Sequence, residues 1–154
     1  HPHNIKRVIR ALEYHHQTGD LISRHIEQER QKESPYDASY FVLNDDRQKL
    51  YHQIDRRVDL MIEAGLVDEV QALKDMGCTS SMVSMQGLGY KEILAYLDGV
   101  LSLDDAIYRI KRDTRHFAKR QITWFKREKD VIWVDKPDFD YDEEKMLAFM
   151  LKHI

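Results

Sequence analysis

The fold class of this chain is decided at Tyr40-Phe41-Val42-Leu43-Asn44-Asp45-Asp46. The apolar run predicts a short strand buried on both faces, and the polar residues after it can cap a helix. That helix is predicted from about Arg47 to Ala64, with Gly65 as its stop. A strand followed by a helix is half of a βαβ unit, so we expect a parallel sheet that continues in sequence outside these residues.

The rest of the chain is predicted to be mainly helical, with one further short strand. In order we expect a short helix over residues 67–77, a loop over 78–86 and a second short helix over 86–99. A long helix over residues 103–126, a strand over 131–134 and a final helix over 142–152 follow. Ser102 lies three residues before Asp105, which is an approximate capping box for the long helix. The expected class is a mainly α chain that completes an α/β core.

Before Tyr40 the sequence predicts two helices joined by a short turn. The first spans residues 5–17 and ends at Thr18-Gly19. The second, capped by Asp20 or a neighbour, spans residues 21–33 and ends at Ser34-Pro35, because the residue before a proline disfavours the α conformation. A connection this short predicts an antiparallel hairpin that forms a small lobe of its own.

The long helix predicted over residues 103–126 carries two stripes. The apolar stripe recurs at spacings of three and four residues: Ile107, Ile110, Thr114, Phe117, Gln121 and Trp124. The second stripe follows two positions later: Arg109, Arg112, His116, Lys119, Thr123 and Lys126. Two positions are about 200° of helix rotation, so one face of the helix is predicted to be core and the other cationic.

The net charge of −3, from 24 Lys and Arg against 27 Asp and Glu, hides this asymmetry. Residues 109–129 hold nine bases and two acids, which indicates an anionic partner, with a solvated helix face as the alternative. No apolar run approaches the roughly 20 residues of a spanning helix, which excludes a membrane protein. The single cysteine, Cys78, excludes a disulfide framework and is typical of the reducing cytosol.

The end of the long helix is a candidate nucleic-acid site. Its bases can neutralise phosphates and its Gln and Thr side chains can reach base edges: Arg115, Lys119, Arg120, Gln121, Thr123 and Lys126. Trp124 or Phe125 could stack a splayed base. Both lie close to the apolar stripe, so core packing is the favoured interpretation on the residues alone.

Two further segments have a functional and a structural interpretation. The glycines of Gln86-Gly87-Leu88-Gly89-Tyr90-Lys91 would let backbone N–H groups approach a phosphate at a helix entry, and a plain turn explains them equally well. Arg57 could hold a diphosphate bidentately at the end of the sheet. On the residues alone, pairing within the helix is favoured, for instance between Arg56 and Asp59.

The first helix alternates bases and apolar residues in Lys6-Arg7-Val8-Ile9-Arg10. These bases are either solvated or a second anion contact. The eight histidines form no convincing metal site. Cys78 has no cysteine partner and no activating base nearby in sequence, so we do not expect a catalytic thiol.

Several motifs follow one another in a fixed order along nearly the whole chain. They are His1-Pro2, Arg7-Val8-Ile9-Arg10-Ala11-Leu12-Glu13, Thr18-Gly19, Ile54-Asp55-Arg56-Arg57-Val58-Asp59, Gly65-Leu66, Glu69-Val70, Gly89-Tyr90-Lys91-Glu92, Thr114-Arg115 and Ala118-Lys119-Arg120-Gln121-Ile122-Thr123-Trp124-Phe125. In this order they resemble the tRNA dimethylallyltransferases, also called isopentenyl-diphosphate:tRNA transferases. No single motif would carry that resemblance.

The resemblance implies transfer of a dimethylallyl group from dimethylallyl diphosphate to N6 of adenosine 37, next to the tRNA anticodon. It implies a P-loop-kinase-like core, a fold class associated with ATP and other nucleotides, with a helical insertion that holds the anticodon arm. Residues 1–34 would belong to the insertion and residues 35–154 to the C-terminal part of the core. The P-loop, the general base and most Mg²⁺ ligands would precede His1, so this chain alone would be inactive.

The resemblance also implies the site residues. Arg57 would lie beside the diphosphate, which reverses its structural interpretation, since a guanidinium there stabilises the charge that develops on the leaving group. The residues that would contact tRNA are Lys6, Arg7, Arg10, Gln86, Gly87, Gly89, Tyr90, Lys91, Arg115, Lys119, Arg120, Gln121, Thr123, Trp124 and Lys126. We expect no metal ligands among these residues, a cytoplasmic location and a monomer.

Two other classes of function compete with the enzyme. A non-enzymatic helical RNA- or DNA-binding module, built on the cationic helix, would show no dependence on an A36-A37 anticodon loop. A helical interaction protein would present the same cations to an acidic protein partner, and competition by nucleic acid separates it from the other two. The order of the motifs favours the enzyme.

Overall fold

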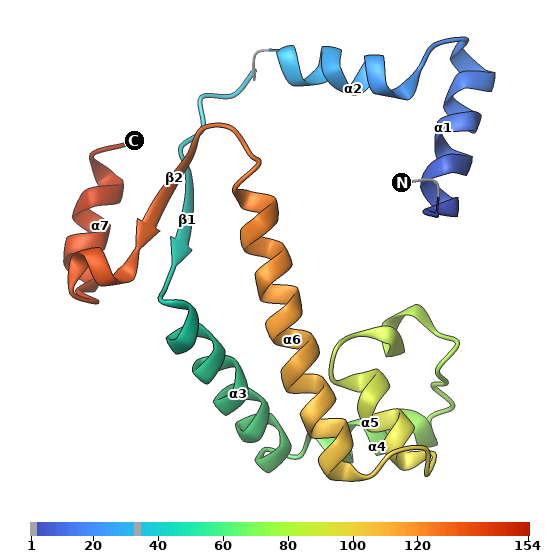
Figure 1. Ribbon diagram of the computed structural model, residues 1–154. Helices are drawn as coiled ribbons and strands as arrows, with labels where there is room; N and C mark the ends of the chain where they lie inside the picture. Colours follow the sequence, from blue (N-terminus) through green and yellow to red (C-terminus); the bar gives the residue numbers. More distant parts are fainter. Residues whose placement is uncertain (1–2, 33–34) are drawn as a thin grey trace. The chain divides into compact units, whose positions relative to one another are not determined.

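The computed structural model describes residues 3–32 and 35–154, which are mainly helical with two short strands (Figure 1). The predicted motif His1-Pro2 and the predicted helix stop at Ser34 lie outside the described residues. The chain divides into two compact units, residues 1–38 and residues 39–154. Each unit is described below by itself.

The first unit contains the helices α1 (Ile5–Thr18) and α2 (Ile22–Gln31). The predicted stop at Gly19 is confirmed, since this residue takes a left-handed conformation with φ of 72°. The predicted cap differs from the one observed. The Asp20 carboxylate accepts from the Leu21 N–H at 2.8 Å and from Arg24 at 2.9 Å, and α2 begins one residue later without a side-chain cap.

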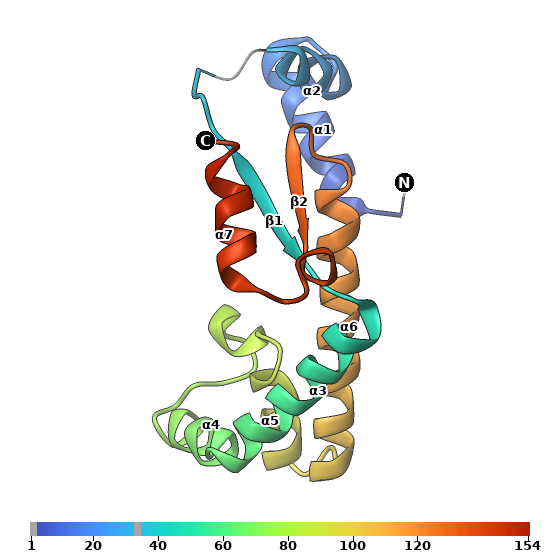
Figure 2. The same ribbon diagram turned by 90° about the vertical axis from the view of Figure 1, so that its left-hand side faces the viewer.

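The two helices of this unit do not form the predicted antiparallel hairpin. They cross transversely in both views (Figures 1 and 2), because the left-handed residue at the end of α1 and the extended backbone of Leu21 redirect the chain. Their contact includes the stacked rings of Tyr14 and His25, with centroids 5.3 Å apart. No described residue of α1 or α2 is buried. The apolar residues that recur at helical spacing along α1 are therefore exposed: Ile5, Val8, Ile9 and Leu12.

The second unit contains a two-stranded sheet made of β1 (Tyr40–Asn44) and β2 (Val131–Asp135). The strands pair in parallel, with Tyr40 opposite Val131, so the predicted parallel sheet is confirmed for these strands. Figures 1 and 2 place the sheet between the helices α6 (Leu103–Phe125) and α7 (Glu143–Leu151). A short 3₁₀ turn, η2 (Lys136–Phe139), leads from β2 towards α7.

The prediction that the first strand is buried on both faces is wrong for two of its apolar residues. Val42 is buried, whereas Leu43 is 58% exposed and Tyr40 is 40% exposed. The faces are covered unevenly: Tyr40 contacts Phe125 at the end of α6, and Phe41 contacts His153 just after α7. With only two strands described, helices cover each face over part of its length.

The first helical elements of the second unit are α3 (Arg47–Glu63), α4 (Leu66–Asp75), the 3₁₀ turn η1 (Val83–Gln86) and α5 (Tyr90–Leu97), followed by α6. The starts of α3 and α6 are as predicted, whereas α5 begins four residues later than predicted and η1 lies in the predicted loop. The Asp46 carboxylate accepts from two N–H groups at the start of α3. The Ser102 hydroxyl oxygen accepts from the Asp105 N–H at 3.1 Å, which confirms the predicted cap of the long helix.

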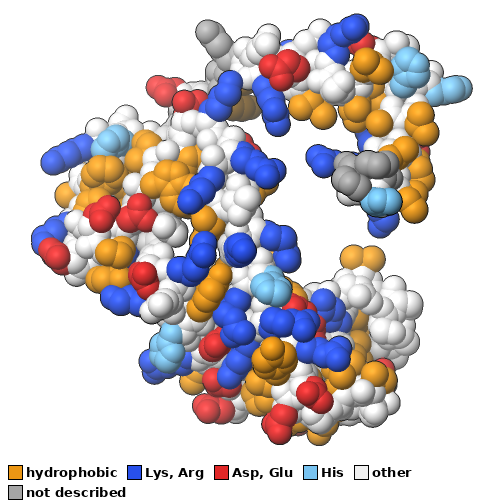
Figure 3. All heavy atoms as spheres, in the orientation of Figure 1, with side chains coloured by type: hydrophobic (Ala, Val, Ile, Leu, Met, Phe, Trp, Pro, Cys, Tyr) orange, Lys and Arg blue, Asp and Glu red, His pale blue; other side chains and the backbone are white. Residues whose placement is uncertain are grey.

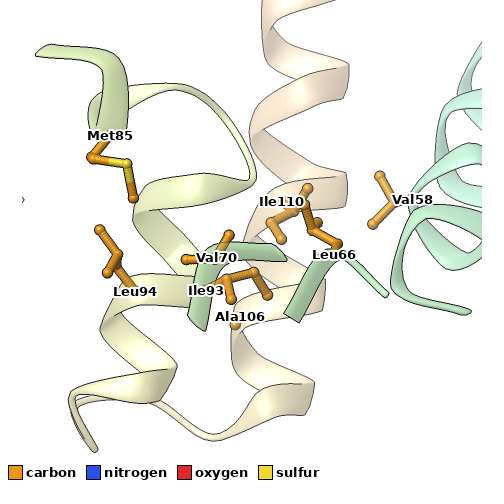
Figure 4. Packing of buried hydrophobic residues seen from close by; sticks show 8 residues of the cluster. All are labelled: Val58, Leu66, Val70, Met85, Ile93, Leu94, Ala106 and Ile110. Carbon is orange, nitrogen blue, oxygen red and sulfur yellow. The ribbon is translucent and has the colours of Figure 1, made fainter. Parts of the chain in front are cut away.

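One apolar cluster holds α3, α4, α5 and α6 together (Figure 4). Its most buried members include Val70, Ile93 and Ala106, each with no exposed surface. Figure 4 shows Val70, Ile93 and Ala106 in the middle of the group, with Val58 of α3 on one side and Met85 of η1 on the other. Along α6 the predicted apolar stripe is therefore core at Ile110. The cluster fixes the N-terminal half of α6 against its neighbours.

Candidate nucleic-acid interface

The cationic face of α6 divides into a paired half and an unpaired half. In the first half, Lys111 contacts Asp59 of α3 at 2.6 Å and Arg115 forms an ion pair with Asp55. Because Asp55 and Asp59 are four residues apart on α3, and their partners are four apart on α6, the two pairs form a ladder between the helices. These cations neutralise carboxylates within the chain.

Beyond Arg115 the bases of α6 and of the turn that follows it face solvent. In the described part of the chain no carboxylate lies within ion-pair distance of the exposed Lys119, Arg120, Lys126 and Arg127. Lys and Arg side chains gather over α6 in Figure 3. A pocket of about 520 Å³ opens there, lined by His116, Lys119, Arg120, Thr123, Trp124 and Arg127. The sequence-predicted residues Lys119, Arg120, Thr123 and Trp124 are thus brought together at one pocket.

The favoured interpretation of Trp124 as a core residue is wrong in this structure. The residue is 54% exposed, and Phe117, two positions earlier in the predicted apolar stripe, is 45% exposed. The cluster that buries the start of α6 does not extend this far, so the apolar stripe has no cover beyond its middle. Phe125 is partly buried against Tyr40, with centroids 6.1 Å apart.

Arg57 lies at a second pocket, of about 390 Å³, between α3 and α6. Its walls are mostly apolar, with Thr114 and Gln121 from α6 and Leu88 from the loop before α5. The predicted pairing of Arg56 with Asp59 is absent, because Asp59 contacts Lys111 instead. Among the described residues no carboxylate pairs with Arg57. Its guanidinium therefore remains available to an anion at the pocket.

The polar groups of the segment from Gln86 to Lys91 contact other parts of the chain. The Gly89 N–H donates to the buried Glu92 carboxylate at 2.9 Å, and φ at Gly89 is 100°, which favours glycine. The Tyr90 hydroxyl donates to Glu69, which raises the pKa of Tyr90, and Lys91 lies 3.3 Å from Glu92. Gly87 has an ordinary negative φ. The helix entry is thus capped by a carboxylate.

Other predicted tRNA-binding residues are placed as follows. Lys6, Arg7 and Arg10 lie exposed on α1 in the first unit, with Arg10 3.7 Å from Glu13. Gln86 donates to the Ser80 carbonyl oxygen, and the Thr123 hydroxyl donates to the Lys119 carbonyl oxygen of its own helix. Their contact with tRNA stays a prediction.

The predicted site lacks two residues that line this pocket, His116 and Arg127. His116 belongs to the predicted cationic stripe, whereas Arg127 lies beyond its last residue. The signal was present in the sequence: positions 116, 120, 123 and 127 are spaced by four, three and four residues, which places them on one face of a continued helix. The predicted set ends at Lys126, one residue before Arg127.

The carboxyl pKa of Asp113 is expected to be lower than its ordinary value, because Arg112 donates to it at 2.8 and 3.2 Å. Since the folded-state pKa is lower than the unfolded one, the ionised carboxylate stabilises the fold above about pH 4. That contribution is lost as the pH falls through the folded-state pKa. An NMR titration checks this: Arg112→Gln should return the pKa towards 3.8, and an unchanged value would contradict the pair.

No group of three or more His, Cys, Asp or Glu able to hold a metal ion occurs in the described ranges, residues 3–32 and 35–154. No helix among them is both long and apolar enough to span a bilayer.

Comparison with known proteins finds one matching family model and close relatives in sequence. A family model described as IPP transferase matches residues 1–128. The chain is 63% identical over 152 residues to the tRNA dimethylallyltransferase of Lachnoclostridium phytofermentans, covering 99% of this chain and 48% of that protein. It is 50% identical over 144 residues to the tRNA dimethylallyltransferase of Acetivibrio thermocellus, covering 94% of this chain and 46% of that protein. The chain spans about half the length of the curated relatives it matches.

Solved structures share the fold. The tRNA delta(2)-isopentenylpyrophosphate transferase of Staphylococcus epidermidis aligns with a TM-score of 0.70 at 36% identity, over 99% of this chain and 48% of that one. The full-length tRNA isopentenylpyrophosphate transferase of Bacillus halodurans aligns with a TM-score of 0.71 at 41% identity, over 97% of this chain and 44% of that one. The expected fold class is confirmed by this match.

Proposed function

The chain belongs to the IPP transferase family, and we propose from this that it supplies tRNA-binding surface and part of the diphosphate site of a tRNA dimethylallyltransferase. One observation carries the proposal. The pocket between α3 and α6 joins Arg57 with Leu88 and Gln121, which come from three separate segments of the sequence. The position expected to hold diphosphate thus adjoins two segments expected to contact tRNA.

The composition of this pocket suits an amphiphilic anion. Apolar side chains such as Ile54, Met61 and Phe117 form most of the wall, and a short hydrocarbon group would be shielded from water there. Arg57 supplies the cation at the same pocket, and a guanidinium can donate two parallel hydrogen bonds to a phosphate group. Dimethylallyl diphosphate combines a hydrocarbon and a diphosphate in this way.

The proposed reaction forms a bond between N6 of adenosine 37 and the allylic carbon of the donor. The carbon–oxygen bond breaks, its electron pair passes to the diphosphate, and the N6 proton passes to a general base that we place in another part of the enzyme. Negative charge grows on the diphosphate as the bond breaks, so Arg57 stabilises the transition state more than the ground state. A requirement for Mg²⁺ in this reaction stays a prediction.

The tRNA is proposed to contact the unpaired half of the α6 cationic face. Lys119, Arg120 and Lys126 would neutralise phosphates of the anticodon arm. The adenine must leave the base stack before its N6 can reach the allylic carbon, which requires an unpaired loop. Lys6, Arg7 and Arg10 on α1 are proposed as a further phosphate contact.

Transfer of labelled dimethylallyl groups tests the proposed function. An enzyme with the full length of the relatives, carrying these 154 residues, should label an anticodon stem-loop that contains A36-A37 and should not label the same stem-loop with G37. Tight binding of both stem-loops without any transfer would instead support the RNA-binding module. Release of diphosphate in step with labelling provides the second readout.

A further inference from the structure

We propose that the pocket beside Trp124 is a subsite for one unpaired nucleotide of the bound RNA, whose base stacks on the indole ring. Arg120 and the previously unassigned Arg127 would bind the phosphates on either side of that nucleotide. The inference rests on the proposed function, because it takes RNA as the ligand of the cationic face. It assigns the stacking to Trp124 rather than Phe125, and it adds Arg127 to the site.

The indole is held in place by a row of aromatic rings. Trp124 lies edge-to-face with Phe125, with centroids 5.0 Å apart and planes at 73°. Phe125 lies edge-to-face with Tyr40 of β1, at 6.1 Å and 74°. The row ties Trp124 to the sheet while the residue stays 54% exposed. A ring that is already ordered loses little conformational freedom when a base stacks on it.

The lining of the pocket matches the composition of single-strand binding sites. Such sites combine cations that follow the phosphates with aromatic rings that stack successive bases. Here Lys119, Arg120 and Arg127 line one pocket together with the indole, and none of the described residues that line it is acidic. The Arg120 guanidinium lies 5.7 Å above the Phe117 ring, a cation–π contact that orders it.

The pocket selects an unpaired base over a paired one. A base inside a duplex has neighbours stacked on both faces and presents only its edges in the grooves. An indole can stack only on a base whose face is free. The volume of about 520 Å³ lies in the range of small-ligand pockets, which admits one nucleotide. A preference for loops over duplexes is therefore expected to depend on Trp124.

The test compares Trp124→Leu with Tyr108→Leu in the full chain. Tyr108 is an aromatic residue of the same helix, 60% exposed and away from the pocket, so it is a matched control. Each variant is titrated with an anticodon stem-loop and with a blunt RNA duplex that has the same number of phosphates. We expect Trp124→Leu to weaken stem-loop binding roughly ten-fold and leave duplex binding unchanged, with no effect of Tyr108→Leu.

Fluorescence gives an independent readout. The chain has two tryptophans, and Trp133→Phe leaves Trp124 as the sole indole. Stacking should quench its emission when the stem-loop binds, and the duplex should leave the emission unchanged at equal saturation. This measurement needs no change at the pocket, so it stands even if Trp124→Leu is poorly folded.

The outcomes separate the two proposals. RNA binding that is equal for Trp124→Leu and the wild type, with unquenched emission, overturns the subsite and leaves the proposed function intact. If polyglutamate quenches the Trp124 emission as the stem-loop does and binds the chain more tightly than the stem-loop, the choice of RNA as ligand is overturned. No binding of either RNA by the wild type at low salt overturns the tRNA contact itself, and the subsite with it.

Discussion

Arg57→Ala is expected to lower the turnover of dimethylallyl transfer by about 10²- to 10³-fold, the usual effect of removing one group that stabilises developing negative charge. Arg57 lies at the pocket between α3 and α6 and has no carboxylate partner in the described residues, so its charge is not used elsewhere. The affinity for tRNA should change little. The diphosphate, and not the RNA, loses its contact.

The measurement is kcat together with the tRNA Kd, in an enzyme with the full length of the relatives that carries this chain. Arg56→Ala is the matched control, since it removes the same charge from the neighbouring exposed position, which does not line the pocket. Arg57→Lys keeps the positive charge but loses the two parallel N–H donors of the guanidinium, so partial activity is expected. Normal turnover of Arg57→Ala would return this residue to a structural role.

Lys119→Ala combined with Arg120→Ala is expected to weaken binding to the anticodon stem-loop and to flatten its salt dependence. Each lost phosphate contact reduces the slope of log K against log salt by about 0.7 for single strands and about 0.9 for duplex. The double variant should therefore lose about 1.4 to 1.8 from the slope. Both residues are exposed, with no carboxylate in ion-pair range among the described residues, so the fold should tolerate the change.

The control is Arg47→Ala combined with Lys152→Ala. It lowers the net charge by the same two units at exposed positions that do not line the Trp124 pocket. Arg115→Ala should also lose less of the slope than the double variant, because Asp55 already neutralises that cation. A salt slope that is the same in all variants would remove the cationic face of α6 from the tRNA contact.

The elements of the fold follow from local signals that the sequence carries. Asp46, Ser102 and Gly19 end or begin helices through contacts within a few residues, and these positions were predicted correctly. Which faces are buried depends on distant parts of the chain. The stripe of α1 and the end of the α6 stripe have apolar spacing but meet no cover in the described residues, so periodicity overstated the core.

In the candidate site too, local features could be predicted from the sequence and contacts between distant segments could not. The cluster of bases on α6 is visible in the sequence, because helical spacing alone places them on one face. The pairing of Lys111 and Arg115 with Asp59 and Asp55 could not be predicted, since it depends on how α3 packs against α6. The pocket at Arg57 likewise joins segments that only tertiary packing brings together.

The most direct test of the account is binding of this chain to an anticodon stem-loop that contains A36-A37, against the same stem with a scrambled loop, across a salt series. We predict tighter binding of the A36-A37 loop at every salt concentration, with affinity for both RNAs falling as salt rises. Equal affinity for the two loops would contradict specific recognition by these residues and would leave only a general basic surface.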